Sequence, residues 1–218
     1  MVTKKIVVLI SGGGTNLQAI IDKLHNSQLA GKKIEIAAVI SNKADVYGLE
    51  RANNTGIKSV VVASKGISER ETYDALLAAE IDQYQPDLIV LAGFMRILTA
   101  DFVNRYLGKM INIHPSLLPK YQGLNTHQSA IDAGDHDHGA SVHFVTEKLD
   151  SGATVLQARV PVFAEDTAEE LAERVLTQEH LIYPLVAQWF LSGRLLMNDN
   201  GQAVLDGEIL PENGYAAD

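Results

Sequence analysis

The feature that most constrains the fold of this chain is the alternation of short apolar runs with helical patterns through its first half. Five runs rich in β-branched residues predict buried strands: Ile6–Ile10, Ile34–Ile40, Ser59–Val62, Leu88–Ala92 and Met110–Ile113. Between them, apolar residues at helical spacing predict helices over Asn16–Leu24, Val46–Asn53, Glu69–Tyr84 and Ala100–Tyr106. Strands that alternate with helices of this length are typical of βαβ units, which build a parallel sheet through right-handed crossovers.

The second half follows a different pattern. Ala140–Val145 and Thr154–Val162 flank a turn at Asp150-Ser151-Gly152 and predict two antiparallel strands. Thr167 and Glu170 fit a capping box at the start of a long helix, whose apolar face would hold Leu171, Val175, Ile182, Val186 and Trp189. The tail from Gly193 predicts a hairpin. We therefore expect an α/β fold: an open, mostly parallel Rossmann-like sheet with helices on both faces and a C-terminal antiparallel extension.

A chain of 218 residues lies at the upper end of the usual size of one domain. No repeat, low-complexity segment or linker divides it. We expect a single domain over residues 1–218, with a nucleotide-binding βαβ half at 1–115 and loops, antiparallel strands and the long helix at 116–218.

Composition excludes several classes of protein. The chain has no cysteine, which excludes disulfides, thiolate zinc sites, iron–sulfur clusters and a cysteine nucleophile. Its apolar runs are far shorter than a membrane span, and only five apolar residues separate Lys5 from Ser11, too few for a signal peptide. We expect a cytoplasmic protein that binds no membrane.

The net charge of −9 argues against a nucleic-acid partner held by phosphate contacts. The charge is uneven: residues 1–109 hold 13 Lys and Arg against 11 Asp and Glu, whereas residues 110–218 hold 5 against 16. This asymmetry has two explanations. Either the second half simply has acidic helix faces in solvent, or the anionic group of a ligand binds the first half.

A glycine-rich loop, Ser11-Gly12-Gly13-Gly14-Thr15-Asn16, lies between the first strand and the first helix. Glycines permit a sharp turn, and the helix start offers free N–H groups to an anion. The dinucleotide fingerprint requires a glycine where this chain has Leu17, and the Gly-Lys-Ser/Thr of ATP-binding loops is missing. The loop therefore favours a single phosphate, unless Thr15 or Asn16 merely caps the helix.

Asn112 and His114 alternate along the last strand of the first half and share one face, about 6.6 Å apart. Pro115 ends the strand, so His114 lies at the carboxyl end, the edge where open α/β sheets bind ligands. An amide donor beside a titratable imidazole suits carbonyl chemistry. Asp150 could face His114, although an Asp before Ser-Gly is most often a turn residue.

Other histidines carry weaker indications. Asp135-His136-Asp137-His138 has the composition of a metal cluster, but it lies between Gly134 and Gly139 and lacks helical ligand spacing. We expect an exposed turn there and no metal. His127 and His143 could each be structural or line a cleft.

Together these segments resemble the formyltransferase family that uses 10-formyltetrahydrofolate. The resemblance covers essentially the whole chain, through residues 11–17, 41–43, 91–98, 111–121, 141–145, 149–152 and 178–180. The run Asn112-Ile113-His114-Pro115-Ser116-Leu117-Leu118-Pro119 is similar to one shared widely among formylfolate enzymes, whereas the Ser-Gly-x-Gly-Thr-Asn loop points to the branch that acts on glycinamide ribonucleotide in purine (IMP) biosynthesis. Gln122 departs from the family, where proline or a basic residue is common.

The resemblance implies roles for individual residues. Asn112, His114 and Asp150 would be catalytic. Nucleotide binding would fall to Gly14, Thr15, Asn16 and Glu179, and the folate pocket would be lined by Arg70, Met95, Arg96, Ile97, Leu98 and Asn112. The partners implied are two small molecules, formylfolate as formyl donor and the nucleotide as acceptor, with no metal and no nucleic acid; the chain would be a monomer or weak homodimer.

Three alternatives remain. A formylfolate hydrolase shares the Asn-x-His strand but normally has an additional N-terminal domain, and the formyltransferase acting on methionyl-tRNA has an additional basic C-terminal domain. A non-catalytic dinucleotide-binding module would account for the glycine loop but not for Asn112, His114 and Asp150 together.

Overall fold

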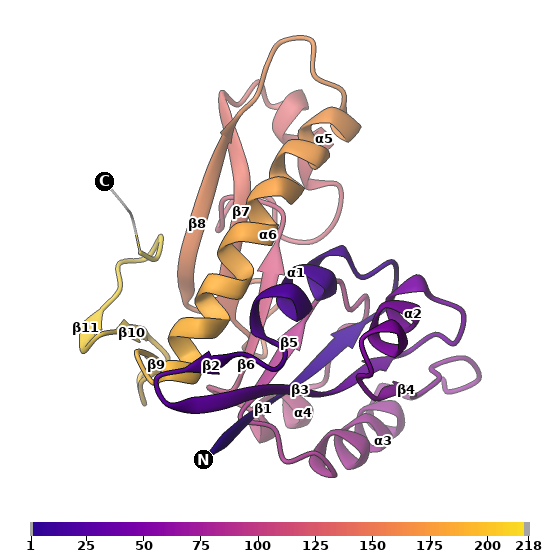
Figure 1. Cartoon of the computed structure of the whole chain (residues 1–218). Coiled ribbons are helices and arrows are strands. Elements are labelled where there is room, and N and C mark those ends of the chain that lie inside the picture. Colours follow the sequence, from indigo (N-terminus) through magenta and orange to yellow (C-terminus); the bar gives the residue numbers. More distant parts are fainter. Residues whose placement is uncertain (1, 216–218) are drawn as a thin grey trace.

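One large sheet organises the molecule (Figure 1). In this computed structural model, which describes residues 2–215, eight strands form a sheet in the order β2-β3-β1-β5-β6-β7-β8, with β4 paired to β3. The strands are β1 (Thr3–Ile10), β2 (Gln28–Leu29), β3 (Lys32–Ser41), β4 (Ser59–Val61), β5 (Leu88–Leu91), β6 (Met110–His114), β7 (Asp137–Phe144) and β8 (Thr154–Pro161).

The parallel core is confirmed. β1 pairs in parallel with β3 and β5, β3 with β4, and β5 with β6, whereas β6–β7 and β7–β8 are antiparallel. The C-terminal hairpin is also confirmed and gains a strand: β9 (Leu195–Met197), β10 (Ala203–Leu205) and β11 (Glu208–Ile209) form a small antiparallel sheet.

Helices cover both faces of the large sheet, as expected. α1 (Thr15–Leu24), α2 (Tyr47–Asn54) and α6 (Ala168–Ser192) share one apolar cluster with β1, β3 and β5, while α3 (Arg70–Asp82) and α4 (Ala100–Arg105) share the cluster on the other face. A short helix that the sequence patterns did not indicate, α5 (Thr126–Asp132), follows the loop after β6.

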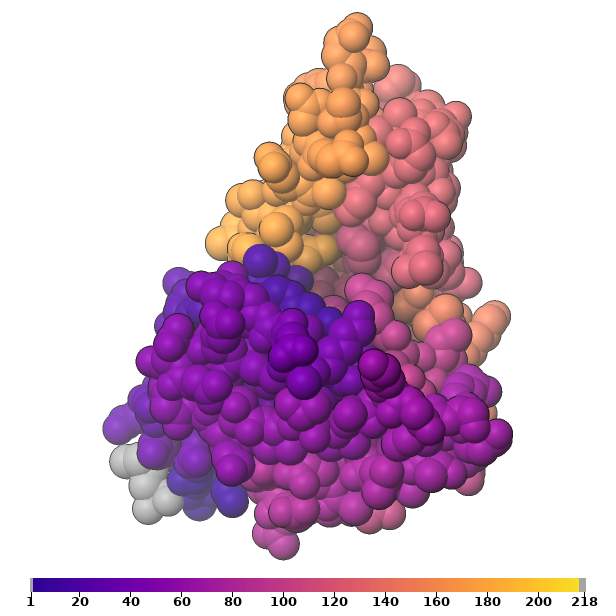
Figure 2. All heavy atoms as spheres, turned by 90° about the vertical axis from the view of Figure 1, so that its right-hand side faces the viewer, coloured from indigo at the N-terminus to yellow at the C-terminus, as the bar shows by residue number. Residues whose placement is uncertain are grey.

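The long helix α6 begins with the expected capping box, in which the side chains and backbones of Thr167 and Glu170 bond to each other reciprocally. The five apolar residues expected on one face, from Leu171 to Trp189, are all buried. The helix packs against α1, β7 and β8, and in Figure 2 it forms, with the neighbouring strands, a narrow upper part above the broader first half.

The strand order explains where a ligand would bind. After β1 the chain builds β3 and β4 on one side and later returns to place β5 and β6 on the other. The carboxyl end of β1 is therefore the switch point of the sheet, where loops diverge and leave a crevice. No helix within residues 2–215 is both long and apolar enough to cross a membrane.

Candidate active site

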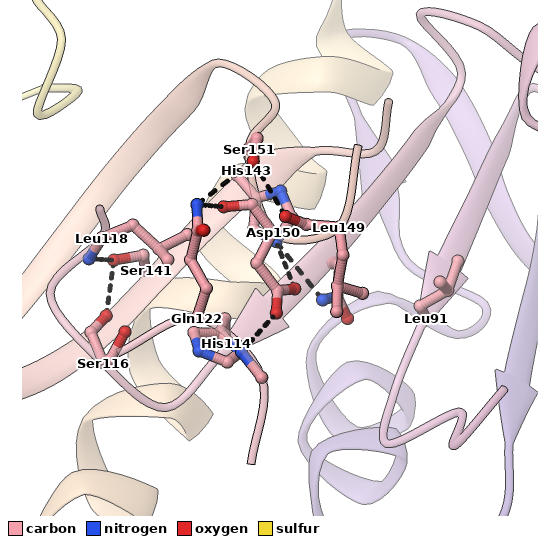
Figure 3. Close-up of polar contacts among 12 residues, drawn as sticks. Leu91, His114, Ser116, Leu118, Gln122, Ser141, His143, Leu149, Asp150 and Ser151 are labelled. Carbon is pink, nitrogen blue, oxygen red and sulfur yellow. Dashed lines mark hydrogen bonds and ion pairs between the residues drawn. The ribbon is translucent and has the colours of Figure 1, made fainter. Parts of the chain in front are cut away.

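His114 ends β6 and is buried, with 5% of the residue exposed. Its Nε2–H donates to the carbonyl oxygen of Tyr121 at 2.7 Å, and its Nδ1 lies 3.5 Å from Asp150 Oδ2 (Figure 3). A carbonyl can only accept a hydrogen bond, so Nε2 carries a proton. The imidazolium form therefore has an acceptor facing each nitrogen.

Asp150 lies in the loop between β7 and β8, with its carboxylate directed at His114 (Figure 3). The Gly123 N–H donates to Oδ2 at 3.0 Å, and the Gln122 side chain donates to the Asp150 carbonyl at 3.1 Å. Its φ of 46° is unusual for a residue other than glycine, and such strain is common at functional sites. The expectation that Asp150 faces His114 is confirmed.

Asn112 is held by a histidine that the sequence left ambiguous. The antiparallel pairing of β6 with β7 sets His143 opposite Asn112. Burial lowers the pKa of His143, which favours the neutral ring. Its Nδ1–H donates to the Phe144 carbonyl at 2.9 Å, so its Nε2 accepts from the Asn112 amide at 3.3 Å. The second N–H of that amide remains for a ligand.

Hydrogen bonds tie the loop after His114 to β7 (Figure 3) and also to β8. Ser141 Oγ donates to the Ser116 carbonyl at 2.6 Å and accepts from Leu118 N at 3.0 Å, while Gln157 donates to the Leu118 carbonyl at 2.8 Å. The Leu118–Pro119 bond is cis. These bonds fix the path of the chain to Tyr121, whose carbonyl orients His114.

The alternative explanation of the glycine loop, a helix cap by Thr15 or Asn16, is not what the structure shows. Gly14 is the N-cap of α1, with φ of 72°, and no side chain caps the first turn. Asn16 instead donates to Glu179 Oε2 at 2.6 Å and so joins α1 to α6. Burial raises the pKa of Glu179, with the Asn16 bond acting in the opposite direction. The uncapped N–H groups stay available to an anion.

A cavity of ≈ 670 Å³ contains Asn112, His114 and Asp150 in its wall. Most of its lining is apolar, and Met95, Arg96, Ile97 and Leu98 all contribute, as do His127 and His143. Its size suits an organic ligand of a few rings. Arg70, the first residue of α3, is exposed and does not line this cavity.

The expectation of an exposed turn at residues 135–138 is wrong in part. Asp137 and His138 belong to β7, and His138 is buried with its Nε2 3.2 Å from His127 Nδ1. Gly139 is required by close strand packing, because a Cβ there would overlap the Ala158 carbonyl. Across residues 2–215, no three Asp, Glu or His side chains cluster as a metal site would need.

Sequence reasoning left the role of His143 open and missed the contacts of Gln122. His143 had a usable signal, since Ser141 and His143 alternate on one face of a strand beside β6. Gln122 had none, because its contacts with Asp150 and with Ser151 Oγ, both at 3.1 Å, depend on how two separate loops meet.

Comparison with known proteins gives one consistent result. The profile of the family described as formyl transferase matches residues 4–187. The Escherichia coli phosphoribosylglycinamide formyltransferase is 56% identical over 98% of this chain and 99% of its own length, and the trifunctional purine biosynthetic protein adenosine-3 of Chironomus tentans is 46% identical over 90% of this chain and 14% of its own. A solved phosphoribosylglycinamide formyltransferase from Coxiella burnetii superposes with a TM-score of 0.91, at 51% identity and 98% coverage of both chains.

Proposed function

Since this chain belongs to the formyl transferase family, we propose that it transfers the formyl group of 10-formyltetrahydrofolate to the primary amine of N1-(5-phospho-D-ribosyl)glycinamide, in purine biosynthesis. The products are the N-formyl nucleotide and tetrahydrofolate. The observation that carries the proposal is the position of the uncapped glycine loop and the His114–Asp150 pair at the same carboxyl edge of the sheet.

The loop of Gly14, Thr15 and Asn16 would bind the phosphate of the nucleotide. Gly14 leaves the first N–H groups of α1 without a side-chain partner, and the helix dipole adds positive potential there. Glu179, buried against Asn16, would accept hydrogen bonds from ribose hydroxyls. This arrangement tethers the sugar, while its glycinamide arm extends toward β6.

The ≈ 670 Å³ cavity would hold the folate. Met95 and Ile97 are more than half exposed in it, as expected of apolar side chains that a ligand covers. Arg96 and Leu98 line the same wall. Arg70 lies outside this lining and remains a proposed contact of the folate.

Chemistry would occur between the two ligands. The nucleotide amine attacks the formyl carbon and generates a tetrahedral oxyanion, which the free Asn112 N–H can stabilise by a hydrogen bond and the imidazolium form of His114 by its positive charge. The Asp150 carboxylate lies 3.5 Å from Nδ1 of that imidazole and holds the ring in place. The attacking nitrogen then loses a proton, which passes to the departing folate nitrogen directly or through water, and the bond between the formyl carbon and that nitrogen breaks. Holding both reactants makes the attack effectively intramolecular, which lowers the barrier by up to several kcal/mol.

We further infer that residues 1–218 act as one domain. The half at 1–115 supplies the phosphate loop and Asn112 with His114, and the half at 116–218 supplies Asp150 and Glu179. Neither half contains the whole site.

A spectroscopic folate assay tests the proposal. The chain is mixed with 10-formyltetrahydrofolate in the presence and in the absence of glycinamide ribonucleotide. Rapid consumption of formylfolate only with the nucleotide is expected. Equal consumption without it would identify a hydrolase and refute the proposed function.

A further inference from the structure

The glycine loop needs support from outside itself. Three successive glycines have the greatest backbone freedom of any tripeptide, so a loop of this kind loses much entropy when it orders around a ligand. An anion-binding loop works best when its N–H groups already converge on one point. The support comes from α2, which packs against the loop at two positions.

Helix α2 binds two consecutive carbonyl groups of the loop. The Gly48 N–H donates to the Gly12 carbonyl at 3.1 Å, and Arg51 Nε–H donates to the Gly13 carbonyl at 2.7 Å. Arg51 is itself held in place, because its Nη1 donates to Gln18 Oε1 at 3.2 Å and its guanidinium carbon lies 4.7 Å from the centre of the Tyr47 ring.

These two bonds determine where the N–H groups of the loop point. In a planar trans peptide the N–H points opposite to the C=O of the same unit. The carbonyls of Gly12 and Gly13 point at α2, so the N–H groups of Gly13 and Gly14 point away from it. Within residues 2–215 neither N–H has a hydrogen-bond partner, and Gly13 is exposed.

Close packing at this contact requires glycine on both sides. A Cβ on Gly14 would lie 2.9 Å from Gly48 Cα, and a Cβ on Gly48 would overlap the Ile10 side chain and lie 2.9 Å from the Gly12 carbonyl oxygen. A side chain at either position would separate α2 from the loop and break the bond between the Gly48 N–H and the Gly12 carbonyl.

We propose that Gly48 and Arg51 are positioning residues for the nucleotide substrate: they hold the carbonyls of Gly12 and Gly13 so that the N–H groups of Gly13 and Gly14 face the phosphate. This rests on the proposed function, which assigns the loop to a phosphate. Arg51 acts here through its Nε–H donor, not through its charge.

A matched pair of uncharged variants separates donor from charge. In Arg51→Gln the side-chain NH₂ occupies the position of the arginine Nε, whereas in Arg51→Met a methyl group occupies it. The measurements are KM for glycinamide ribonucleotide, KM for formylfolate, kcat, and the Kd of inorganic phosphate by calorimetry, at about 0.15 M salt. Arg159→Gln, which alters an exposed arginine on β8, serves as the control.

We expect Arg51→Gln to stay within about threefold of the parent chain. Arg51→Met should raise KM for the nucleotide and Kd for phosphate by about tenfold, the effect of one lost hydrogen bond to an ordered loop, with kcat and the folate KM unchanged. Gly48→Ala should weaken phosphate binding in the same selective way.

Equal losses in the Gln and Met variants would show that Arg51 acts by charge, and parent-like values in both would show that it does not act on the loop. Either result overturns the proposal, as does an equal rise in both KM values. The phosphate titration needs no formyl transfer. If the parent chain did not formylate the nucleotide, the proposed function would be refuted. The phosphate Kd values of Arg51→Gln and Arg51→Met would still test the positioning role of Arg51.

Discussion

Replacing His143 tests the claim that this residue acts on catalysis through Asn112. His143 Nε2 accepts from the Asn112 amide at 3.3 Å, and burial lowers the pKa of His143, which favours the neutral ring. In His143→Phe the ring volume stays but the acceptor is lost. In the matched His143→Gln variant the side-chain oxygen can replace Nε2 as the acceptor.

The loss of kcat in His143→Phe should be smaller than the loss on removing Asn112 itself. Removing one oxyanion donor outright, as in Asn112→Ala, costs about 10²–10³ in kcat. Removing only the bond that orients that donor costs about 0.5–1.5 kcal/mol, so kcat of His143→Phe should fall roughly two- to tenfold while both KM values stay near the parent. His143→Gln should recover most of the loss.

The assay is the steady-state rate at saturating substrates over pH 6 to about 9, with folding checked by circular dichroism. Because burial lowers the pKa of His143 and so favours its neutral form, the pH profile of both variants should keep the parent shape. A profile that loses a limb in His143→Gln would mean that His143 exchanges a proton in the reaction, and the positioning argument would be refuted.

Three further predictions concern other parts of the site. Asp150→Asn removes the carboxylate 3.5 Å from His114 Nδ1 and leaves that buried nitrogen without an anionic partner; kcat should fall by about tenfold or more, and normal activity would contradict this. Gly14→Val places a side chain at φ of 72° and 2.9 Å from Gly48 Cα, so KM for the nucleotide should rise far more than KM for formylfolate, whereas equal rises would indicate general damage. Burial lowers the pKa of His138 to about 4, so the folded state binds fewer protons than the unfolded state between about pH 6.5 and 4, and the free energy of unfolding falls as the pH drops through that range. In His138→Gln, urea denaturation should show a smaller fall over the same range, and an unchanged fall would contradict the lowered pKa.

The strands and helices of the first half could be predicted because their signals are local. Ile6–Ile10 and Leu88–Ala92 are apolar on both faces, as strands of a covered parallel sheet must be, and the helical repeats between them are regular. The Asn112–His114 pair followed from strand alternation alone. Its importance came from the position of Pro115, which places the pair at the carboxyl edge of the sheet.

The second half was less predictable because its contacts are not local. The approach of Asp150 to His114 depends on the register of β7 against β6 and on the loop that Gln122 and Gly123 hold. Gly139 indicated a turn in the sequence, but in the structure it allows β7 to approach the Ala158 carbonyl on β8, which extends β7 back to Asp137 and buries His138. Glycine spacing alone does not distinguish these two uses.

The central claim is that the phosphate loop and the His114 edge together make this site a transferase. The most direct test follows an isotopic label in the formyl carbon of 10-formyltetrahydrofolate and measures its partition between the nucleotide product and free formate. The amine must attack in its neutral form, and an α-amino group with a pKa near 8 supplies that form at physiological pH. We predict one labelled formyl group on the nucleotide for each tetrahydrofolate released, with almost none in formate. Label that accumulates as formate while the nucleotide stays unlabelled would contradict the account.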